Sequence, residues 1–363
     1  MAVALGGSDR SFVYAALPAR VVFGNGTVAR VREEAERLAI SRALVITTPA
    51  QRAQGEAIAA ALADRAAGVF AGAVMHTPIE VTERALAAMT ELGADGVVAI
   101  GGGSTIGLGK AIAVRTGAPQ LAIPTTYAGS EMTPILGETA RGQKTTRSNL
   151  DILPETVIYD VELTLGLPAA LSGTSGINAI AHAAEALYAV NGNPIVAIFA
   201  EQAIAALARA LPVIARAPRD ATARADALYG AWLAGTCLGV AGMALHHKLC
   251  HVLGGTFNLP HAETHTAVLP HAIAYNAAAA PAAMATIARA LGRSDGDAAR
   301  GLYELAGAVG AERSLAALGM PEDGLDRAAE IAAGNPYPNP RPIERAAIRD
   351  LLARAFTGAA PPS

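Results

Sequence analysis

Short apolar runs alternate with segments of helical periodicity in the first half of the chain. The apolar runs predict β-strands at residues 43–47, 69–75, 96–100 and 121–123. The segments between them repeat apolar residues every three or four positions and predict helices at 51–65, 81–92 and 106–115. This alternation indicates a parallel sheet covered by helices on both faces. Ahead of it, residues 11–23 are expected to form an antiparallel ribbon.

The second half of the chain loses its strand signals from about Pro168 onward. Ala-rich segments with helical spacing predict helices at 174–190, 194–210, 222–253, 281–291, 298–308, 321–333 and 343–356. The pattern therefore predicts an α/β domain over residues 1–165 and an all-helical domain over residues 166–363. A chain of 363 residues agrees with two domains of about 150 residues each.

Composition and charge narrow the class of protein. Hydrophobic residues make up 52% of the chain and charged residues only 16%, against a typical charged share of about 25%, so a disordered chain is excluded. The net charge is -3 and no block of Lys or Arg stands out. We therefore expect no nucleic-acid partner.

The compartment is indicated by the N-terminus, one long apolar stretch and the cysteines. The first residues lack a basic segment followed by a long apolar run, so no signal peptide is expected. The uncharged stretch 228–245 is long enough for a membrane span, but it contains four glycines and runs directly into His-His-Lys, so we interpret it as a buried helix. Cys237 and Cys250 lie in apolar sequence and are expected to be reduced thiols. We expect a cytoplasmic protein without a membrane partner.

A glycine-rich turn follows the strand predicted at 96–100 and opens the next helix. The sequence GGGST at 101–105 would let the backbone approach a phosphate, and a helix N-terminus presents free N–H groups. It matches neither a Walker A loop nor G-x-G-x-x-G, and a tight turn without a ligand is the alternative. Thr125 and Thr126 follow the next strand, so their hydroxyls are expected at the same carboxyl edge, where α/β sheets bind ligands.

The strand predicted at 43–47 is followed by Thr48-Pro49, with no acidic residue to hold a ribose hydroxyl. A missing carboxylate removes a repulsion against the 2′-phosphate of NADPH. We therefore expect NADH or NADPH as cofactor, with Thr48 among the residues that bind it.

Histidines are concentrated in the helical half, where seven of the eight lie between residues 182 and 271. Two pairs of polar residues are spaced four apart and so share a helix face, namely Asn178 with His182 and His247 with His251. With His261 nearby, this spacing is typical of a transition-metal site. A single histidine more often caps a helix or fills a polar core pocket, but the group as a whole indicates one shared functional site.

Several longer motifs resemble those of the iron-containing alcohol dehydrogenases. They are GGGST at 101–105, PTTYAGSEMT at 124–133, Lys144, DVELT at 160–164, His182 and the spacing His247-x3-His251-x9-His261. A finer resemblance is to the maleylacetate reductases of that superfamily, carried by residues 76–78, 175–189, 253–271 and 335–343. The resemblance runs through nearly the whole chain.

The resemblance implies a fold and a cofactor site. The fold is a Rossmann-like N-terminal domain followed by an all-α C-terminal domain, as in iron-containing alcohol dehydrogenases and dehydroquinate synthases, and the assembly is a homodimer. The residues implied to hold the pyrophosphate at the turn are Gly102, Gly103 and Ser104. Those implied to contact the rest of the nucleotide are Thr125, Thr126 and Lys144.

The resemblance also implies a catalytic pocket in the helical domain. His247 and His251 are expected to face the nicotinamide and the substrate, and either one is the expected proton donor. The remaining pocket residues are His182, His261 and Asn178. Outside this group, Arg341 could bind a substrate carboxylate or form a salt bridge within its loop.

Asn178 departs from the metal-dependent relatives, which carry Asp at that position. The other three ligand positions are present as His182, His247 and His261. An Asp adds negative charge to a bound divalent ion, whereas Asn offers a neutral carbonyl oxygen, so any metal would bind more weakly. The resemblance to maleylacetate reductases, where this substitution is typical, implies catalysis without a metal.

The substrate that the resemblance implies is compatible with Asn in place of Asp at position 178. Maleylacetate is a conjugated enone with two carboxylates, so hydride can add to the alkene carbon β to the ketone and form an enolate that hydrogen-bond donors stabilise. A histidine cluster can donate such bonds, supply the proton and attract a small dicarboxylate. We expect NAD(P)H-dependent reduction of maleylacetate to 3-oxoadipate, in the degradation of aromatic compounds. Alternatives are a metal-dependent alcohol dehydrogenase of the same superfamily, a lyase related to dehydroquinate synthase and a non-catalytic nucleotide-binding protein.

Overall fold

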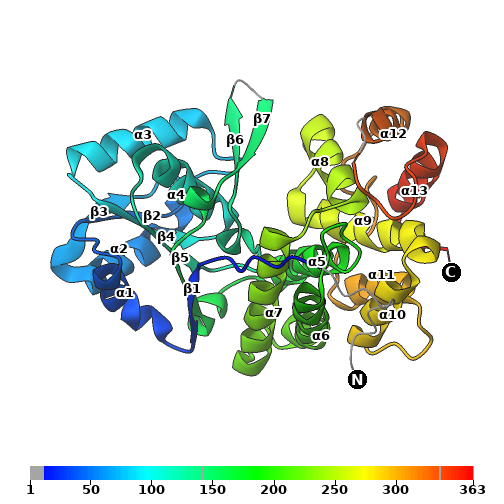
Figure 1. Cartoon of the computed structure of the whole chain (residues 1–363), viewed down its shortest axis with the longest axis horizontal. Helices are drawn as coiled ribbons and strands as arrows, with labels where there is room; N and C mark the ends of the chain where they lie inside the picture. Colours follow the sequence, from blue (N-terminus) through cyan, green and yellow to red (C-terminus); the bar gives the residue numbers. More distant parts are fainter. Residues whose placement is uncertain (1–11, 141–142, 335–336, 363) are drawn as a thin grey trace. The chain divides into compact units, whose positions relative to one another are not determined.

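The computed structural model describes residues 12–140, 143–334 and 337–362. The chain divides into two compact units, one of residues 17–167 and the other of residues 168–362 together with 12–16. The first unit is α/β and the second is all helical (Figure 1). Each is described by itself.

A six-stranded parallel sheet forms the centre of the α/β unit, in the order β1-β8-β5-β4-β2-β3. Its strands are β1 (Arg20–Gly24), β2 (Ala43–Ile46), β3 (Ala66–Phe70), β4 (Gly96–Gly101), β5 (Gln120–Pro124) and β8 (Thr156–Asp160). Strands β2, β4, β5 and β8 are buried along their whole length. Burial on both faces explains why β2 and β4 are continuous apolar runs without alternation.

Four helices cover the two faces of this sheet: α1 (Val31–Arg37), α2 (Arg52–Leu62), α3 (Ile79–Glu91) and α4 (Gly103–Thr116). Val45 packs with residues of α1 and α2, whereas its neighbours Leu44 and Ile46 pack with residues of α3 and α4. Successive side chains of a strand point to opposite faces, so one apolar strand serves both layers. Figure 1 shows the two helix pairs on opposite sides of the sheet.

The ribbon expected at residues 11–23 is wrong. Position 11 lies outside the described residues, residues 12–19 form no strand, and β1 pairs in parallel with β8. A short apolar run does not reveal its partner, and this partner lies more than 130 residues away along the chain. The antiparallel ribbon of this unit is instead formed by β6 (Ile135–Ala140) and β7 (Gln143–Ser148).

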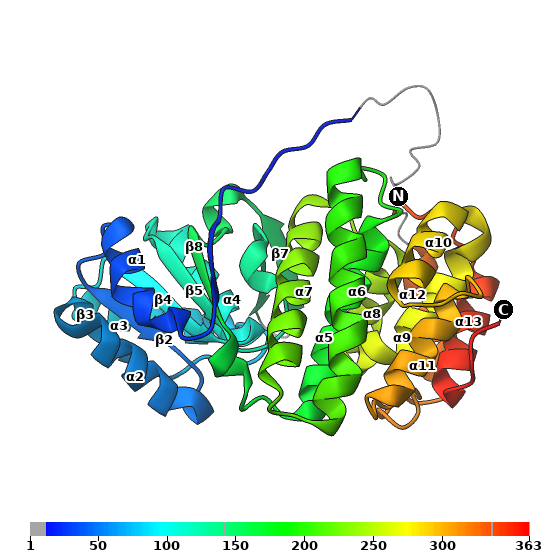
Figure 2. The same ribbon diagram turned by 90° about the horizontal axis from the view of Figure 1, so that it is seen from below.

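Nine helices follow in the described part of the second unit. They are α5 (Ala169–Ala186), α6 (Pro194–Arg216), α7 (Ala221–Val240), α8 (Leu245–Phe257), α9 (His261–Asn276), α10 (Pro281–Ala290), α11 (Ala298–Ala308), α12 (Gly324–Gly334) and α13 (Arg345–Thr357). Helices α5, α6 and α7 pack side by side (Figure 2). A Cβ on Gly230 of α7 would lie 3.0 Å from the Ala203 carbonyl oxygen of α6, so glycine lets these two backbones approach closely.

The single helix predicted at 222–253 is also wrong, because the chain bends by 93° between α7 and α8. The Asn191 side chain holds this break, donating to the Val240 carbonyl and accepting from the Gly242 N–H. The Glu185 carboxylate accepts the N–H groups of Ala244 and His246 at the start of α8. Both partners lie far away in sequence, so the local helical pattern does not show the break.

Among the described residues, α6 alone is long and apolar enough to cross a membrane, and the bent pair α7–α8 meets the same criterion if taken as one unit. A core helix meets this criterion too, and α6 packs against α5 and α7. The expected absence of a membrane partner stays a prediction.

Candidate active site

Helix α5 carries three polar side chains on one face of an Ala-rich sequence. Asn178, His182 and Glu185 are spaced i, i+4 and i+7, so they line up along the helix. All three are buried, with exposed fractions of 4%, 3% and 0%. Buried polar groups in an otherwise apolar helix need partners, and here they determine how the next helices are arranged.

Glu185 holds the start of α8 and one of its histidines. Its carboxylate accepts the backbone N–H groups of Ala244 and His246 at 2.9 and 2.7 Å. It also lies 2.7 Å from Nδ1 of His247. An ionised carboxylate can only accept hydrogen bonds, so Nδ1 of His247 carries the hydrogen and Nε2 is the free end of the ring. Glu185 was not among the residues expected from the sequence, although its spacing from Asn178 and His182 was a usable signal.

The histidines expected in the pocket are brought together on α5, α8 and α9. The rings of His182 and His247 are stacked with centroids 5.0 Å apart, and His251 lies 6.4 Å from His247. His261 contacts the ring of His265 at 4.4 Å, and His265 lies 5.0 Å from His247. His265 was given no role from the sequence, and in the structure it joins the two halves of the cluster.

Burial keeps much of this cluster neutral. Loss of solvation lowers the pKa of His182 and His265 well below the ordinary value, and the neighbouring histidines lower it further. The buried atoms without a hydrogen-bond partner in the described structure include Asn178 Oδ1, His182 Nδ1, His247 Nε2 and His265 Nε2. Unsatisfied polar atoms that gather at one place indicate a site for a polar ligand.

The resemblance implies four positions for a metal site, and their geometry shows whether they fit an ion. Asn178 supplies no charge, and His182 and His247 lie face to face with ring planes 28° apart. Within the described residues, the His, Cys, Asp or Glu side chains whose ligand atoms converge within 4.8 Å are His246, Cys250 and His265. The set Asn178, His182, His247 and His261 thus does not fit a divalent metal as it stands.

The glycine turn of the α/β unit joins β4 to α4. Gly101 has φ of 150°, and a Cβ there would lie 2.5 Å from the Thr105 hydroxyl oxygen, so glycine is required. Gly102 caps α4 without any side-chain hydrogen bond, and α4 begins at Gly103 and Ser104. A helix N-terminus left without a side-chain cap presents its N–H groups to an anion such as a phosphate.

Three of the expected cofactor residues lie around this turn. The Thr125 N–H donates to the Gly101 carbonyl, and the Thr125 hydroxyl accepts from the Gln51 side chain. Gln51 in turn accepts from the Thr48 hydroxyl. A Cβ on Gly102 would lie 3.1 Å from Cγ2 of Thr126. The structure therefore brings Thr48, Thr125 and Thr126 together, and it adds Gln51, which the sequence analysis missed.

Two other residues singled out from the sequence lie elsewhere. Lys144 is on β7 opposite Thr139, and its side chain lies outside the described part of the structure. Arg341 stacks its guanidinium 4.2 Å from the centre of the Tyr275 ring and donates to the Tyr275 carbonyl. The salt bridge considered for Arg341 does not appear among the described contacts.

The chain is similar to known proteins over nearly its whole length. The model of the iron-containing alcohol dehydrogenase family matches residues 18–161, and the model of its C-terminal domain matches residues 172–356. The maleylacetate reductase of Sphingobium indicum is 58% identical over 350 residues, which cover 96% of this chain and 99% of the relative.

The chain is also similar to solved structures of maleylacetate reductases. The maleylacetate reductase of Agrobacterium tumefaciens is 59% identical with a TM-score of 0.94, covering 97% of this chain and 100% of the other. The enzyme of Rhizobium sp. strain MTP-10005 is 58% identical, also with a TM-score of 0.94, and covers 97% and 100%. The two-part fold, the histidine cluster and these matches lead to one conclusion: the chain belongs to the iron-containing alcohol dehydrogenase family and, within it, to the maleylacetate reductases.

Proposed function

We propose that this chain reduces the conjugated C=C bond of maleylacetate to give 3-oxoadipate, with NADH or NADPH as hydride donor. The observation that carries the proposal is the buried group formed by Asn178, His182, Glu185 and His247, which offers hydrogen bonds and a proton but places no carboxylate at position 178. Such a pocket suits a dianionic enone.

The reaction adds a hydride and a proton. A reduced nicotinamide held through the glycine turn would supply a hydride to the alkene carbon β to the ketone, and the electron pair of the C=C bond would then form an enolate. A hydrogen-bond donor at the ketone oxygen stabilises this charge. Protonation of the α-carbon then restores the ketone and completes the product, and a histidine supplies that proton.

His247 is the better placed of the two expected proton donors. The Glu185 carboxylate lies 2.7 Å from its Nδ1 and fixes the orientation of the ring. A protonated His247 can then donate through Nε2, which has no partner in the described structure. His251 lies one turn further along α8 and is exposed, which suits binding of the substrate carboxylates.

Single alanine substitutions separate these two roles. We expect His247→Ala to lower kcat by about 100-fold or more, as for loss of a general acid. We expect His251→Ala to raise KM for maleylacetate with a smaller effect on kcat. Steady-state kinetics at saturating NADH measures both, and a larger kcat loss for His251→Ala would reverse the assignment.

We further propose that the reaction needs no catalytic metal. The neutral donor of Asn178 and the stacked rings of His182 and His247 support this. In the test, maleylacetate is generated in situ and NADH absorbance is followed with and without a chelator. Equal rates are expected, whereas loss of activity that iron or zinc restores would instead establish the metal-dependent alternative. Absence of any maleylacetate-dependent NADH loss would overturn the proposed function itself.

The glycine turn is proposed to bind the pyrophosphate of the cofactor. In Gly102→Ala the added methyl meets Thr126 at 3.1 Å and crowds the N-terminus of α4. We expect the affinity for NADH to fall about tenfold, roughly the 1.4 kcal/mol of a modest steric misfit. Fluorescence titration with NADH measures this, with Gly166→Ala as control because a methyl there meets nothing within 4 Å. Equal affinities in the two variants would remove the turn from the cofactor site.

A further inference from the structure

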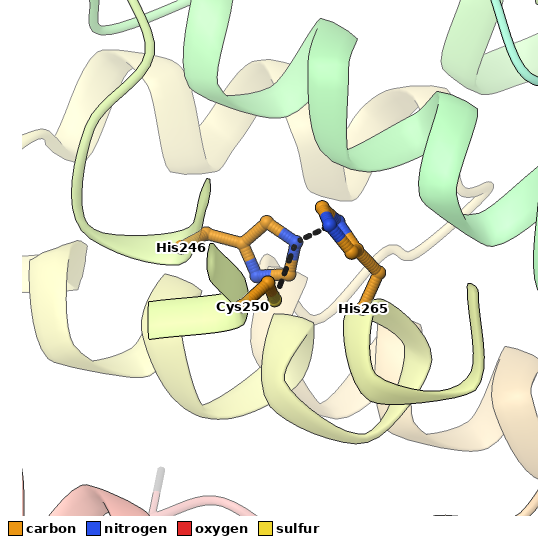
Figure 3. A group of neighbouring side chains, drawn as sticks. All are labelled: His246, Cys250 and His265. Atoms are coloured by element: carbon orange, nitrogen blue, oxygen red, sulfur yellow. Dashed lines mark hydrogen bonds between the residues drawn. The ribbon is translucent and has the colours of Figure 1, made fainter. Parts of the chain in front are cut away.

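A second group of ligand-type side chains lies next to the proposed catalytic histidines. His246 and Cys250 are one turn apart on α8, and His265 faces them from α9 (Figure 3). All three are buried, and their nitrogen and sulfur atoms lie within 4.8 Å of one another. None of them belongs to the set Asn178, His182, His247 and His261 that the family resemblance implies.

The atoms of this group converge on one point. His246 Nε2 lies 2.9 Å from His265 Nδ1 and 3.8 Å from the Cys250 sulfur. Zinc takes imidazole nitrogen at about 2.0–2.1 Å and thiolate sulfur at about 2.3 Å, so tetrahedral ligands lie roughly 3.3–3.6 Å apart. Small side-chain rotations would bring the present spacings into that range.

Nitrogen and sulfur donors select the kind of ion. Two imidazoles and a thiolate favour a borderline or soft cation such as Zn²⁺ over Mg²⁺ or Ca²⁺, which prefer oxygen. Burial lowers the pKa of both histidines well below the ordinary value, so the rings are neutral and can offer lone pairs. Burial and the nearby Glu185 raise the pKa of the Cys250 thiol, so this group carries its proton when no ion is bound.

The charge balance also favours a cation. The Glu185 carboxylate accepts the backbone N–H of His246 at 2.7 Å and so places a negative charge beside the group. A divalent ion, the Cys250 thiolate and Glu185 together carry no net charge. Burial of a neutral set costs far less than burial of an isolated ion.

We propose that His246, Cys250 and His265 form a binding site for a thiophilic divalent cation of the zinc class. Coordination replaces the hydrogen bond between the two histidines, and the thiol proton passes to water as the sulfur–metal bond forms. The inference does not depend on the proposed reductase activity, because binding is measured without substrate or cofactor.

Co²⁺ is the probe, because a thiolate ligand gives it a near-ultraviolet sulfur-to-metal charge-transfer band. The whole chain, stripped with chelator, is titrated with Co²⁺, and we expect one equivalent to produce this band and Zn²⁺ to remove it. Cobalt bound to Asn178, His182, His247 and His261 would give no such band, since that set contains no sulfur.

Two variants locate the sulfur. Cys250→Ser should lose the band, whereas Cys237→Ser should keep it, because Cys237 is equally buried but lies on α7 and contacts the Val196 carbonyl. His265→Asn, which keeps the sulfur, should weaken Co²⁺ binding at least about tenfold. Absence of the band from the unmodified chain, its survival in Cys250→Ser or its loss in Cys237→Ser would each overturn the proposal.

Discussion

Replacing Glu185 with Gln is expected to lower kcat for maleylacetate reduction by about 100-fold, within the range for loss of general acid catalysis. The carboxylate lies 2.7 Å from Nδ1 of His247 and orients the ring. A Gln side chain can turn its NH₂ group toward Nδ1, and the same group opposes the N–H groups of Ala244 and His246 that the carboxylate accepts. The proposed proton donor is then less well oriented.

The measurement is steady-state kinetics over a range of pH, with thermal unfolding as a second readout. Glu131→Gln is the matched control, because Glu131 is equally buried but pairs with Tyr159 in the α/β unit. We expect this control to change stability and to leave the shape of the pH–kcat profile unaltered. If Glu185→Gln keeps kcat within about twofold of the unmodified chain, His247 does not depend on this carboxylate.

The substitution Asn178→Asp is expected to weaken the binding of maleylacetate. An aspartate at position 178 of α5 adds a negative charge where we propose that the dianionic substrate binds, and like charges repel by roughly one to several kcal/mol. We expect kcat/KM for maleylacetate to fall about 10- to 100-fold, mainly through KM. The same carboxylate supplies the charged ligand that metal-dependent relatives carry.

Kinetics and metal analysis of the purified variant test both effects. Bound iron or zinc should rise in Asn178→Asp, and Co²⁺ at this position should give no sulfur charge-transfer band. Asn178→Ala is the control, since it removes the carbonyl oxygen without adding charge, and we expect a smaller change in KM. An unchanged KM in Asn178→Asp would contradict the role proposed for the neutral amide.

Much of the α/β unit could be predicted from the sequence. Strands β2, β4 and β5 and helices α2, α3 and α4 follow from apolar runs and helical periodicity, because strands buried on both faces must be apolar throughout. The end of β4 could be placed from its glycines, since Gly101 needs a φ of 150°. Strand β3 runs over Ala66–Phe70 instead of the predicted 69–75, because its Ala-Ala-Gly start carries little strand signal.

The candidate site could be predicted only in part. Asn178 with His182 and His247 with His251 were recognised from four-residue spacing, which is a local property of a helix. Glu185 and Gln51 were missed because their roles come from partners far away in sequence, at positions 244–247 and 125. The grouping of His246, Cys250 and His265 depends on how α8 packs against α9, which periodicity does not specify.

The sequence by itself determined the two-part organisation, the glycine turn and the family, because each rests on local patterns or long motifs. The tertiary structure alone decided the parallel pairing of β1 with β8, the 93° bend between α7 and α8 and the orientation of His247. The bend shows the physical reason most directly. An uninterrupted helical pattern favours one long helix, but the buried Glu185 carboxylate must be satisfied, and it binds the N–H groups that a new helix start leaves free.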